Sequence, residues 1–274
     1  MFFGKSKEKE MKMIWEVTKA DKKSHLVGTA HFFPYSFRIS LSRYLKDARA
    51  VLFEGPLDND NMTKVVAAGT EENTTHLFDI LDKQTVDRIS EAIVPVCRHK
   101  SSYLFFNFRT LSQENPVYEM IRGMKPWFAF FTIWSNYLES KGWRHSVDYE
   151  AYTLAKEMGK EVAFLETIEE QIKVLESLSL ERIQFFLERV DQWSEYAQAY
   201  VNAYLDGDLE NLKSMWGRFP TRHSAVIGDR DEILYKRMLA NLERGDAIAF
   251  VGAPHLRGIS DLLRNDGYEI QKKR

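Results

Sequence analysis

Cysteine is almost absent from this sequence, since Cys97 is the single one among 274 residues. One cysteine can form neither a disulfide within the chain nor a thiolate cluster around a metal ion, and it fits a reducing compartment. An excess of charge is missing as well, because 38 lysines and arginines stand against 40 aspartates and glutamates. The formal net charge of -2 therefore gives the protein no general attraction to nucleic acid or to an anionic membrane.

Long hydrophobic runs and common catalytic signatures are also missing. The longest apolar run, residues 127–134 (WFAFFTIW), is far shorter than the ~20 residues that span a bilayer. The N-terminal stretch MFFGKSKEKEMKM has scattered charges in place of the apolar segment of a signal peptide, so residues 1–11 are expected to be a disordered lead-in. The sequence contains no HExxH, Gly-x-Ser-x-Gly or Walker motif. We expect a soluble cytoplasmic protein with no nucleic-acid and no membrane partner.

What the sequence does contain is a globular pattern of strands and helices. With 44% hydrophobic residues, the chain can bury a substantial core. We expect one domain over residues 1–274, an α/β fold whose central mixed sheet is flanked by helices, with a large helical insertion at about 60–145. Short apolar runs predict the strands. These are residues 13–18 and 24–29, which form a hairpin, 50–53, 161–165, 247–251 and an edge strand at 268–271.

Helices fill most of the remaining chain. The region 179–244 is expected to be helical, with breaks at Gly207, within 217–220 and near Gly228, because glycine and proline interrupt helices. The aromatic residues of 127–134 are interpreted as core packing rather than as a ligand site. Further helices are expected at 37–48, 146–159, 259–264 and directly after Glu166.

Two copies of a Gly-x-x-His motif follow hydrophobic strands at opposite ends of the chain. They are GTAH, which ends in His31, and GAPH, which ends in His255. Glycine lets the backbone turn sharply after a strand, and the histidine then projects beyond it. A third copy, which ends in His145, follows an expected helix and has less weight.

Four expected strands end in a polar side chain that suits chemistry: His31, Glu54, Glu166 and His255. Ligands of open α/β sheets bind beyond the carboxyl ends of the strands, so these groups converge if the strands are neighbours. Two imidazoles with carboxylates suit either a divalent ion or a metal-free acid–base site. The plainer alternatives are hydrogen-bonded loop histidines, and carboxylates that favour a helix N-terminus or solvent.

The order of seven sequence blocks resembles the TraB/PrgY/GumN family over almost the whole chain. This family is related to the Tiki metalloproteases and, more distantly in fold, to erythromycin-esterase-like hydrolases. The blocks are GTAH (28–31), FEGP (53–56), MKPW (124–127), SVDYEAYTLAKEMGKEVAFLETIEEQ (146–171), YLDGD (204–208), GDRDEILYKRM (228–238) and FVGAPHLRGISDLLRNDGYEI (250–270).

The resemblance implies one cleft lined by two Gly-x-x-His motifs, a glutamate and an arginine, with divalent-metal hydrolase or peptidase activity in some members. By position, His31 and His255 match the motif histidines, Glu54 matches the glutamate and Arg230 matches the arginine. Asp148 and Glu166 match further positions of the family pattern.

The leading hypothesis is a metal-dependent hydrolase that acts on a peptide or another amide. His31, Glu54 and His255 would hold a divalent Mn, Co or Zn ion or its water, and Glu166 would be the general base. Arg230 would stabilise a developing oxyanion, and Asp148 is a further catalytic candidate. Two alternatives stay open: a non-catalytic protein that binds a peptide or small ligand in the same cleft, and a metal-free esterase-like hydrolase.

Overall fold

The computed structural model describes residues 8–71, 77–97, 115–214, 219–222 and 224–273. Within these residues the chain forms a six-stranded mixed sheet flanked by helices, as the sequence pattern predicts. The strands are β1 (Ile14–Lys19), β2 (Lys22–Thr29), β3 (Ala50–Phe53), β4 (Glu161–Phe164), β5 (Ala247–Gly252) and β6 (Glu269–Lys272). The helices are α1 (Arg38–Asp47), α2 (Asn59–Gly69), α3 (Lys83–Cys97), α4 (Pro116–Ile121), α5 (Pro126–Ser140), α6 (Val147–Glu157), α7 (Ile168–Glu176), α8 (Leu180–Leu187), α9 (Trp193–Asp206), α10 (Leu209–Ser214), α11 (Ser224–Arg244) and α12 (Leu256–Asn265).

The sheet has the strand order β4-β3-β5-β2-β1-β6. Strands β4, β3, β5 and β2 are parallel, whereas β1 and β6 add antiparallel pairs at one side. The β1–β2 hairpin closes through Ala20 and Asp21, whose φ angles of 48° and 62° suit a tight two-residue turn. The central strand β5 is buried over nearly its whole length, which explains its continuous apolar run AIAFV. The carboxyl ends of the four parallel strands therefore meet at one edge.

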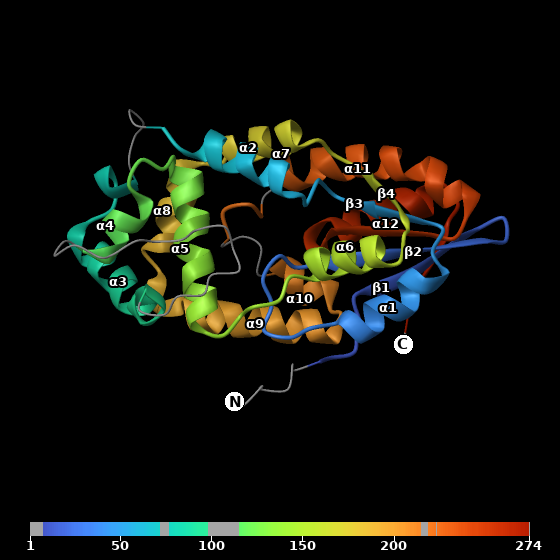
Figure 1. Ribbon diagram of the computed structural model, residues 1–274, viewed down its shortest axis with the longest axis horizontal. Coiled ribbons are helices and arrows are strands. Elements are labelled where there is room, and N and C mark those ends of the chain that lie inside the picture. Colours follow the sequence, from blue (N-terminus) through green and yellow to red (C-terminus); the bar gives the residue numbers. More distant parts are fainter. Residues whose placement is uncertain (1–7, 72–76, 98–114, 215–218, 223, 274) are drawn as a thin grey trace.

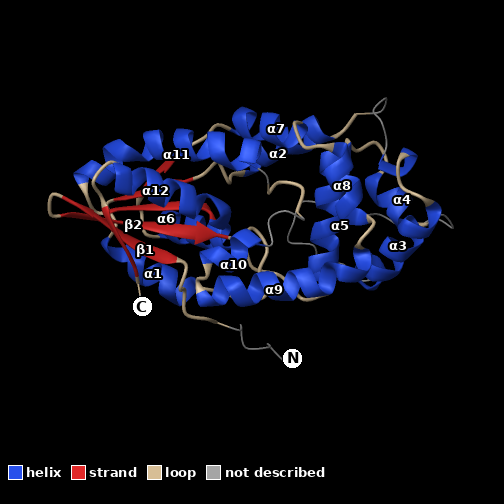
Figure 2. Cartoon of the chain, turned by 180° about the vertical axis from the view of Figure 1, so that it is seen from behind, coloured by secondary structure: helices blue, strands red, loops and turns tan. Residues whose placement is uncertain are grey.

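The helices extend the molecule away from that edge. Figure 1 shows α11, α7 and α2 along one long side and α9 and α10 along the other, with α5 and α8 at the end opposite the sheet. The view from behind shows the same arrangement (Figure 2). Helices α2 to α5 fall between β3 and α6, in the region expected as a helical insertion. The carboxyl ends of the strands thus face an interior that helices from several parts of the chain surround.

Two local expectations differ from the structure. Residues 8–11 are part of the fold rather than of a lead-in, because Glu8 pairs with Ser36 and Met11 is buried; residues 1–7 lie outside the described residues. The break expected near Gly228 was wrong, since α11 runs through this residue. The end expected at Gly207 is confirmed: this glycine caps α9 with φ 62°, a conformation that glycine adopts without strain.

None of the described helices combines the length and the apolar character that a bilayer-spanning segment needs.

Candidate active site

The strand ends bring the expected side chains together. His31 follows β2, Glu54 follows β3 and His255 follows β5, and all three line one cavity of about 460 Å³. Glu166 follows the edge strand β4 and is buried beside them. The backbone joins the strand ends directly, because the Glu166 N–H donates to the Glu54 carbonyl at 2.8 Å. The prediction that these four positions converge is therefore confirmed by their geometry.

Arg230 of α11 connects the two glutamates. Its Nε donates to one oxygen of Glu166 at 2.8 Å, and its Nη2 donates to the other at 2.6 Å and to Glu54 Oε1 at 2.5 Å. Burial lowers the pKa of Arg230, but the two carboxylates outweigh this effect and raise it. Arg230 therefore stays charged and fixes both carboxylates.

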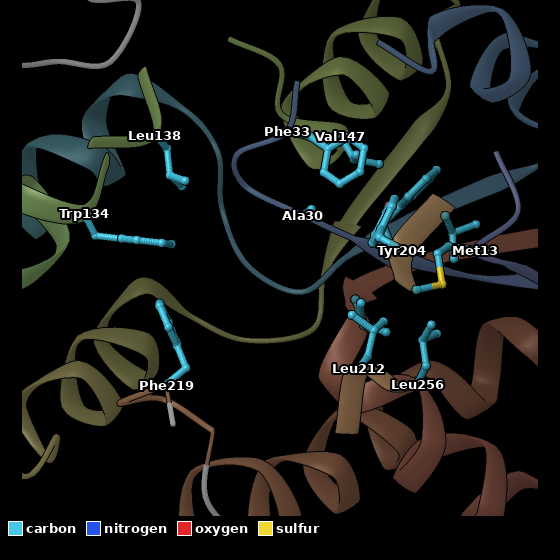
Figure 3. Close-up of a cluster of buried hydrophobic side chains, with 14 of the residues drawn as sticks. Met13, Ala30, Phe33, Trp134, Leu138, Val147, Tyr204, Leu212, Phe219 and Leu256 are labelled. Carbon is cyan, nitrogen blue, oxygen red and sulfur yellow. The ribbon is translucent and has the colours of Figure 1, made fainter. Parts of the chain in front are cut away.

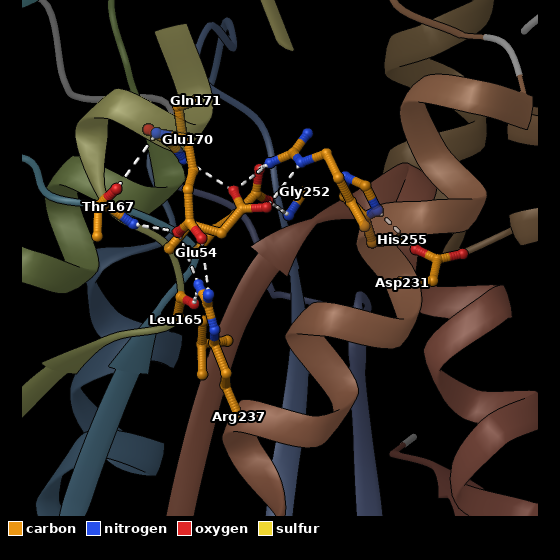
Figure 4. Close-up of polar contacts among 11 residues, drawn as sticks. Glu54, Leu165, Thr167, Glu170, Gln171, Asp231, Arg237, Gly252 and His255 are labelled. Atoms are coloured by element: carbon orange, nitrogen blue, oxygen red, sulfur yellow. Dashed lines mark hydrogen bonds and ion pairs between the residues drawn. The ribbon is translucent and has the colours of Figure 1, made fainter. Parts of the chain in front are cut away.

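Glu54 is an ionised carboxylate held in the cavity wall. Its Oε2 accepts a 2.6 Å hydrogen bond from the Gly252 N–H, and Figure 4 shows the two residues side by side. Burial raises the pKa of Glu54, but the charge of Arg230, with His255 and the Gly252 N–H, outweighs this and lowers it to about 2. Both carboxylate oxygens of Glu54 are thus already engaged.

His255 is oriented by a carboxylate that sequence reasoning did not identify. The imidazole is only 4% exposed, and its Nδ1 lies 2.6 Å from Asp231 Oδ1 (Figure 4). Asp231 stands next to Arg230 on α11, so one helix turn holds the side chains that follow three strands, β3, β4 and β5. Burial raises the pKa of Asp231, and the bond to His255 opposes this rise. The block GDRD already contained Asp231, but only the packing of α11 shows its role.

His31 has an equivalent partner on α6. Its Nδ1 contacts the Asp148 carboxylate, which is itself buried and accepts a 2.5 Å bond from the Ser146 hydroxyl. The charge of Asp148 raises the pKa of His31 to about 9, although burial opposes the rise. The side chain is 73% exposed because it projects into the cavity, where water reaches the ring although protein surrounds it. His31 is therefore a cation at neutral pH.

The two histidines share one chemical arrangement. In each histidine, Nδ1 contacts a buried carboxylate, and Nε2 is the ring nitrogen that this contact does not use. Such a carboxylate fixes the tautomer and the ring orientation. His145, the histidine of the third Gly-x-x-His motif, pairs with Glu150 at 2.9 Å but does not line the cavity. The lower weight given to this motif agrees with its position.

The arrangement of the expected metal ligands decides whether they can hold an ion. Among the described residues, no three His, Cys, Asp or Glu side chains are grouped closely enough to hold one. Glu54 is engaged by Arg230 and Gly252, and a protonated His31 would first have to lose its proton. The donor types suit a divalent ion, but His31, Glu54 and His255 do not fit one as their side chains lie here.

A glycine on α12 makes room for the His255 partner. A Cβ at Gly258 would stand 1.9 Å from Asp231 Oδ2, so any side chain there displaces Asp231. We expect Gly258→Ala to lower the free energy of unfolding by about 1–3 kcal/mol, as other overpacked sites do, because the new side chain displaces Asp231 from His255. The measurement is urea unfolding.

The matched control for this substitution is Gly228→Ala on α11. A Cβ at Gly228 meets nothing within 4 Å, and the residue is helical. Alanine is favoured over glycine inside a helix, so this variant should gain about 0.5–1 kcal/mol. Equal stability of the Gly258→Ala variant and the parent would contradict the assignment of Gly258 as the space for Asp231.

The fold and the site together define an α/β protein in which two histidines follow parallel strands, and each histidine is oriented by a carboxylate. A comparison with protein-family models matches residues 13–272 to the TraB/PrgY/gumN family. The match spans nearly the whole chain, so the protein belongs to this family. No curated protein and no solved structure matches the chain.

Proposed function

We propose that the protein is a hydrolase that cleaves an amide or ester bond, in a peptide or a small acyl compound, at the polar end of its cavity. The observation that carries the proposal is the pair His31 and His255, which line one cavity and are each oriented by a buried carboxylate. Water addition to a carbonyl needs a base for the water and a positive group for the developing oxyanion. The two imidazoles can supply these two roles.

The environments of the histidines assign the roles. Asp231 holds the Nδ1 side of the His255 ring, so Nε2 is the nitrogen that can accept a proton from water. His31 is positively charged and can hold the carbonyl oxygen as negative charge develops there, or protonate the leaving group. Glu166 is the base expected from the sequence, but both of its oxygens accept hydrogen bonds from Arg230. We therefore assign it the role of holding Arg230 in place. Arg230 in turn fixes Glu54.

A metal-dependent form of the same hydrolase is the second candidate. It is favoured by the Nδ1–carboxylate bond of each histidine, because metal-ligating histidines usually have such a partner. Because His31, Glu54 and His255 do not fit an ion as their side chains lie, they would have to rearrange to hold Mn, Co or Zn, which would supply a Lewis acid. We place either form in the cytoplasm, in keeping with the single cysteine.

The test combines elemental analysis with an assay on the purified full chain. The substrates are p-nitrophenyl esters and amino-acid p-nitroanilides, each with and without a chelator and with Mn, Co or Zn added back. We expect turnover that survives chelation. Loss of turnover on chelation, with near-stoichiometric metal beforehand, would support the metal-dependent form. Saturable binding of these compounds without cleavage would overturn the proposal and indicate a binding protein.

A further inference from the structure

The cavity has a second part that the hydrolytic groups do not use. Beyond the strand ends it is walled by aromatic side chains from α5, α9 and the segment 219–222. Figure 3 shows Trp134, Leu138 and Phe219 across from Ala30, which directly precedes His31. Trp127, Phe128, Phe131 and Trp134 line the cavity, so the aromatic band expected only as core packing has two roles.

The size and lining of this part favour a small, mostly apolar ligand. The whole cavity has a volume of about 460 Å³, which is in the range of small-molecule sites. The wall continues from the aromatic residues to Val66 of α2 and Val174 of α7. An aliphatic chain or ring gains stability from such a wall by leaving water, roughly in proportion to its apolar area.

One cation, Arg222, stands in the wall near the reaction centre. Its guanidinium bonds to Tyr200, and its charge acts on the pKa of both Tyr200 and His31. The segment that carries it is held by Arg182 of α8, which donates to the carbonyls of Phe219, Pro220 and Arg222 at 3.1–3.4 Å. A guanidinium has five N–H donors, so Arg222 can hold Tyr200 and a ligand carboxylate together.

The charges on the lining favour an anionic ligand over a cationic one. Among the described residues that line the cavity, Glu54 is the one carboxylate, and Arg230 is its counter-ion. Arg222, a cation in the cavity wall, would repel an ammonium group, although aromatic walls otherwise suit one. A carboxylate, by contrast, forms charge-assisted hydrogen bonds with a guanidinium.

We propose that the substrate is an N-acyl amino acid, whose apolar acyl chain lies along the aromatic wall and whose carboxylate is bound by Arg222. This inference rests on the proposed hydrolase. In such a molecule one carbon separates the amide nitrogen from the carboxylate, which agrees with a cation close to the reacting histidines. Hydrolysis adds water to the amide carbonyl and breaks the C–N bond. The products are a fatty acid and a free amino acid, whose nitrogen takes the proton.

The test measures binding separately from cleavage. Calorimetry on the full-length His255→Ala variant compares N-decanoylglycine, its methyl ester and N-acetylglycine. We expect the acid to bind roughly tenfold or more tightly than its neutral ester, because the ester cannot form the charge-assisted bonds. Affinity should also rise with acyl length, by up to about fourfold per methylene buried. Equal affinity of the acid and the ester would overturn the inference. This comparison does not require a substitution of Arg222.

The role of Arg222 is tested by Arg222→Gln in the same background. The preference for the acid should disappear, whereas the exposed control Arg264→Gln on α12 should keep it. A preference that persists in the Arg222→Gln variant would contradict the assignment of this residue.

Cleavage by the parent protein then separates the two proposals. Release of glycine and decanoate from N-decanoylglycine supports both. Selective binding of the acid, without cleavage of the acid or of the p-nitrophenyl esters and p-nitroanilides, would refute the hydrolase and leave the ligand class standing. Cleavage of neutral esters with no binding of the acid would refute the ligand class alone.

Discussion

Replacing His255 by alanine is expected to lower kcat/KM for ester or amide hydrolysis by about 10²–10⁴-fold, the usual contribution of a positioned general base. Nδ1 of His255 is held by Asp231, and the ring lines the cavity beside Glu54. The side chain is buried, so the variant leaves Asp231 without its partner and loses about 1–3 kcal/mol of stability as well. Activity must therefore be measured at a temperature where the variant is fully folded.

The matched control for this variant is His25→Gln. His25 lies on the same strand as the first motif, but it pairs with Ile248 near the start of β5 and contacts Tyr44, away from the cavity. This variant should keep the parental kcat/KM. If His255→Ala retains more than about a tenth of the parental value, its role as the base is wrong. The double variant His31→Ala/His255→Ala then shows whether either histidine takes part.

The positions at the strand ends could be predicted because they depend on local pattern and on one topological rule. Strand β5 reads as a continuous apolar run, and a polar residue follows each of β2, β3, β4 and β5. Once the strands are parallel neighbours, their carboxyl ends meet. His31, Glu54, Glu166 and His255 follow from this reasoning without knowledge of side-chain packing.

The partners of those residues depend on how helices pack and could not be predicted in the same way. Asp231 reaches His255 because α11 packs across the strand ends with this side chain turned toward them. Gly258 leaves the space for the carboxylate. The aromatic residues of α5 have apolar neighbours on several sides, so hydrophobicity alone does not separate the core from a cavity wall. Gly228 was expected to break a helix, but its intrinsic penalty of ~1 kcal/mol is small beside the tertiary contacts of α11.

Replacing Arg230 by methionine is expected to lower the free energy of unfolding at pH 7 by about 3–5 kcal/mol, because it leaves Glu54 and Glu166 close together without their shared cation. The matched control is Arg237→Met on the same helix. Arg237 also bonds to both oxygens of a glutamate, Glu170, but both side chains are about 40% exposed. An exposed pair contributes at most about 1 kcal/mol, and Arg237 also donates to the Leu165 carbonyl at 2.7 Å, so this variant should lose no more than about 1–2 kcal/mol.

The pH dependence distinguishes the loss of the cation from a simple packing defect. In the parent, the pKa of Glu54 is lowered from 4.5 to about 2, so its contribution of at most about 3 kcal/mol is fully present above pH 4.5 and is lost as the pH falls toward 2. In the Arg230→Met variant, Glu54 stays buried but loses the charge that lowers its pKa most, so its pKa rises above the parental value and less of its pH-dependent contribution remains. The stability of the variant, measured by urea unfolding from pH 8 to pH 5, should therefore rise relative to that of the parent as the pH falls. A slope parallel to that of the parent would show that the arginine acts through packing rather than through its charge.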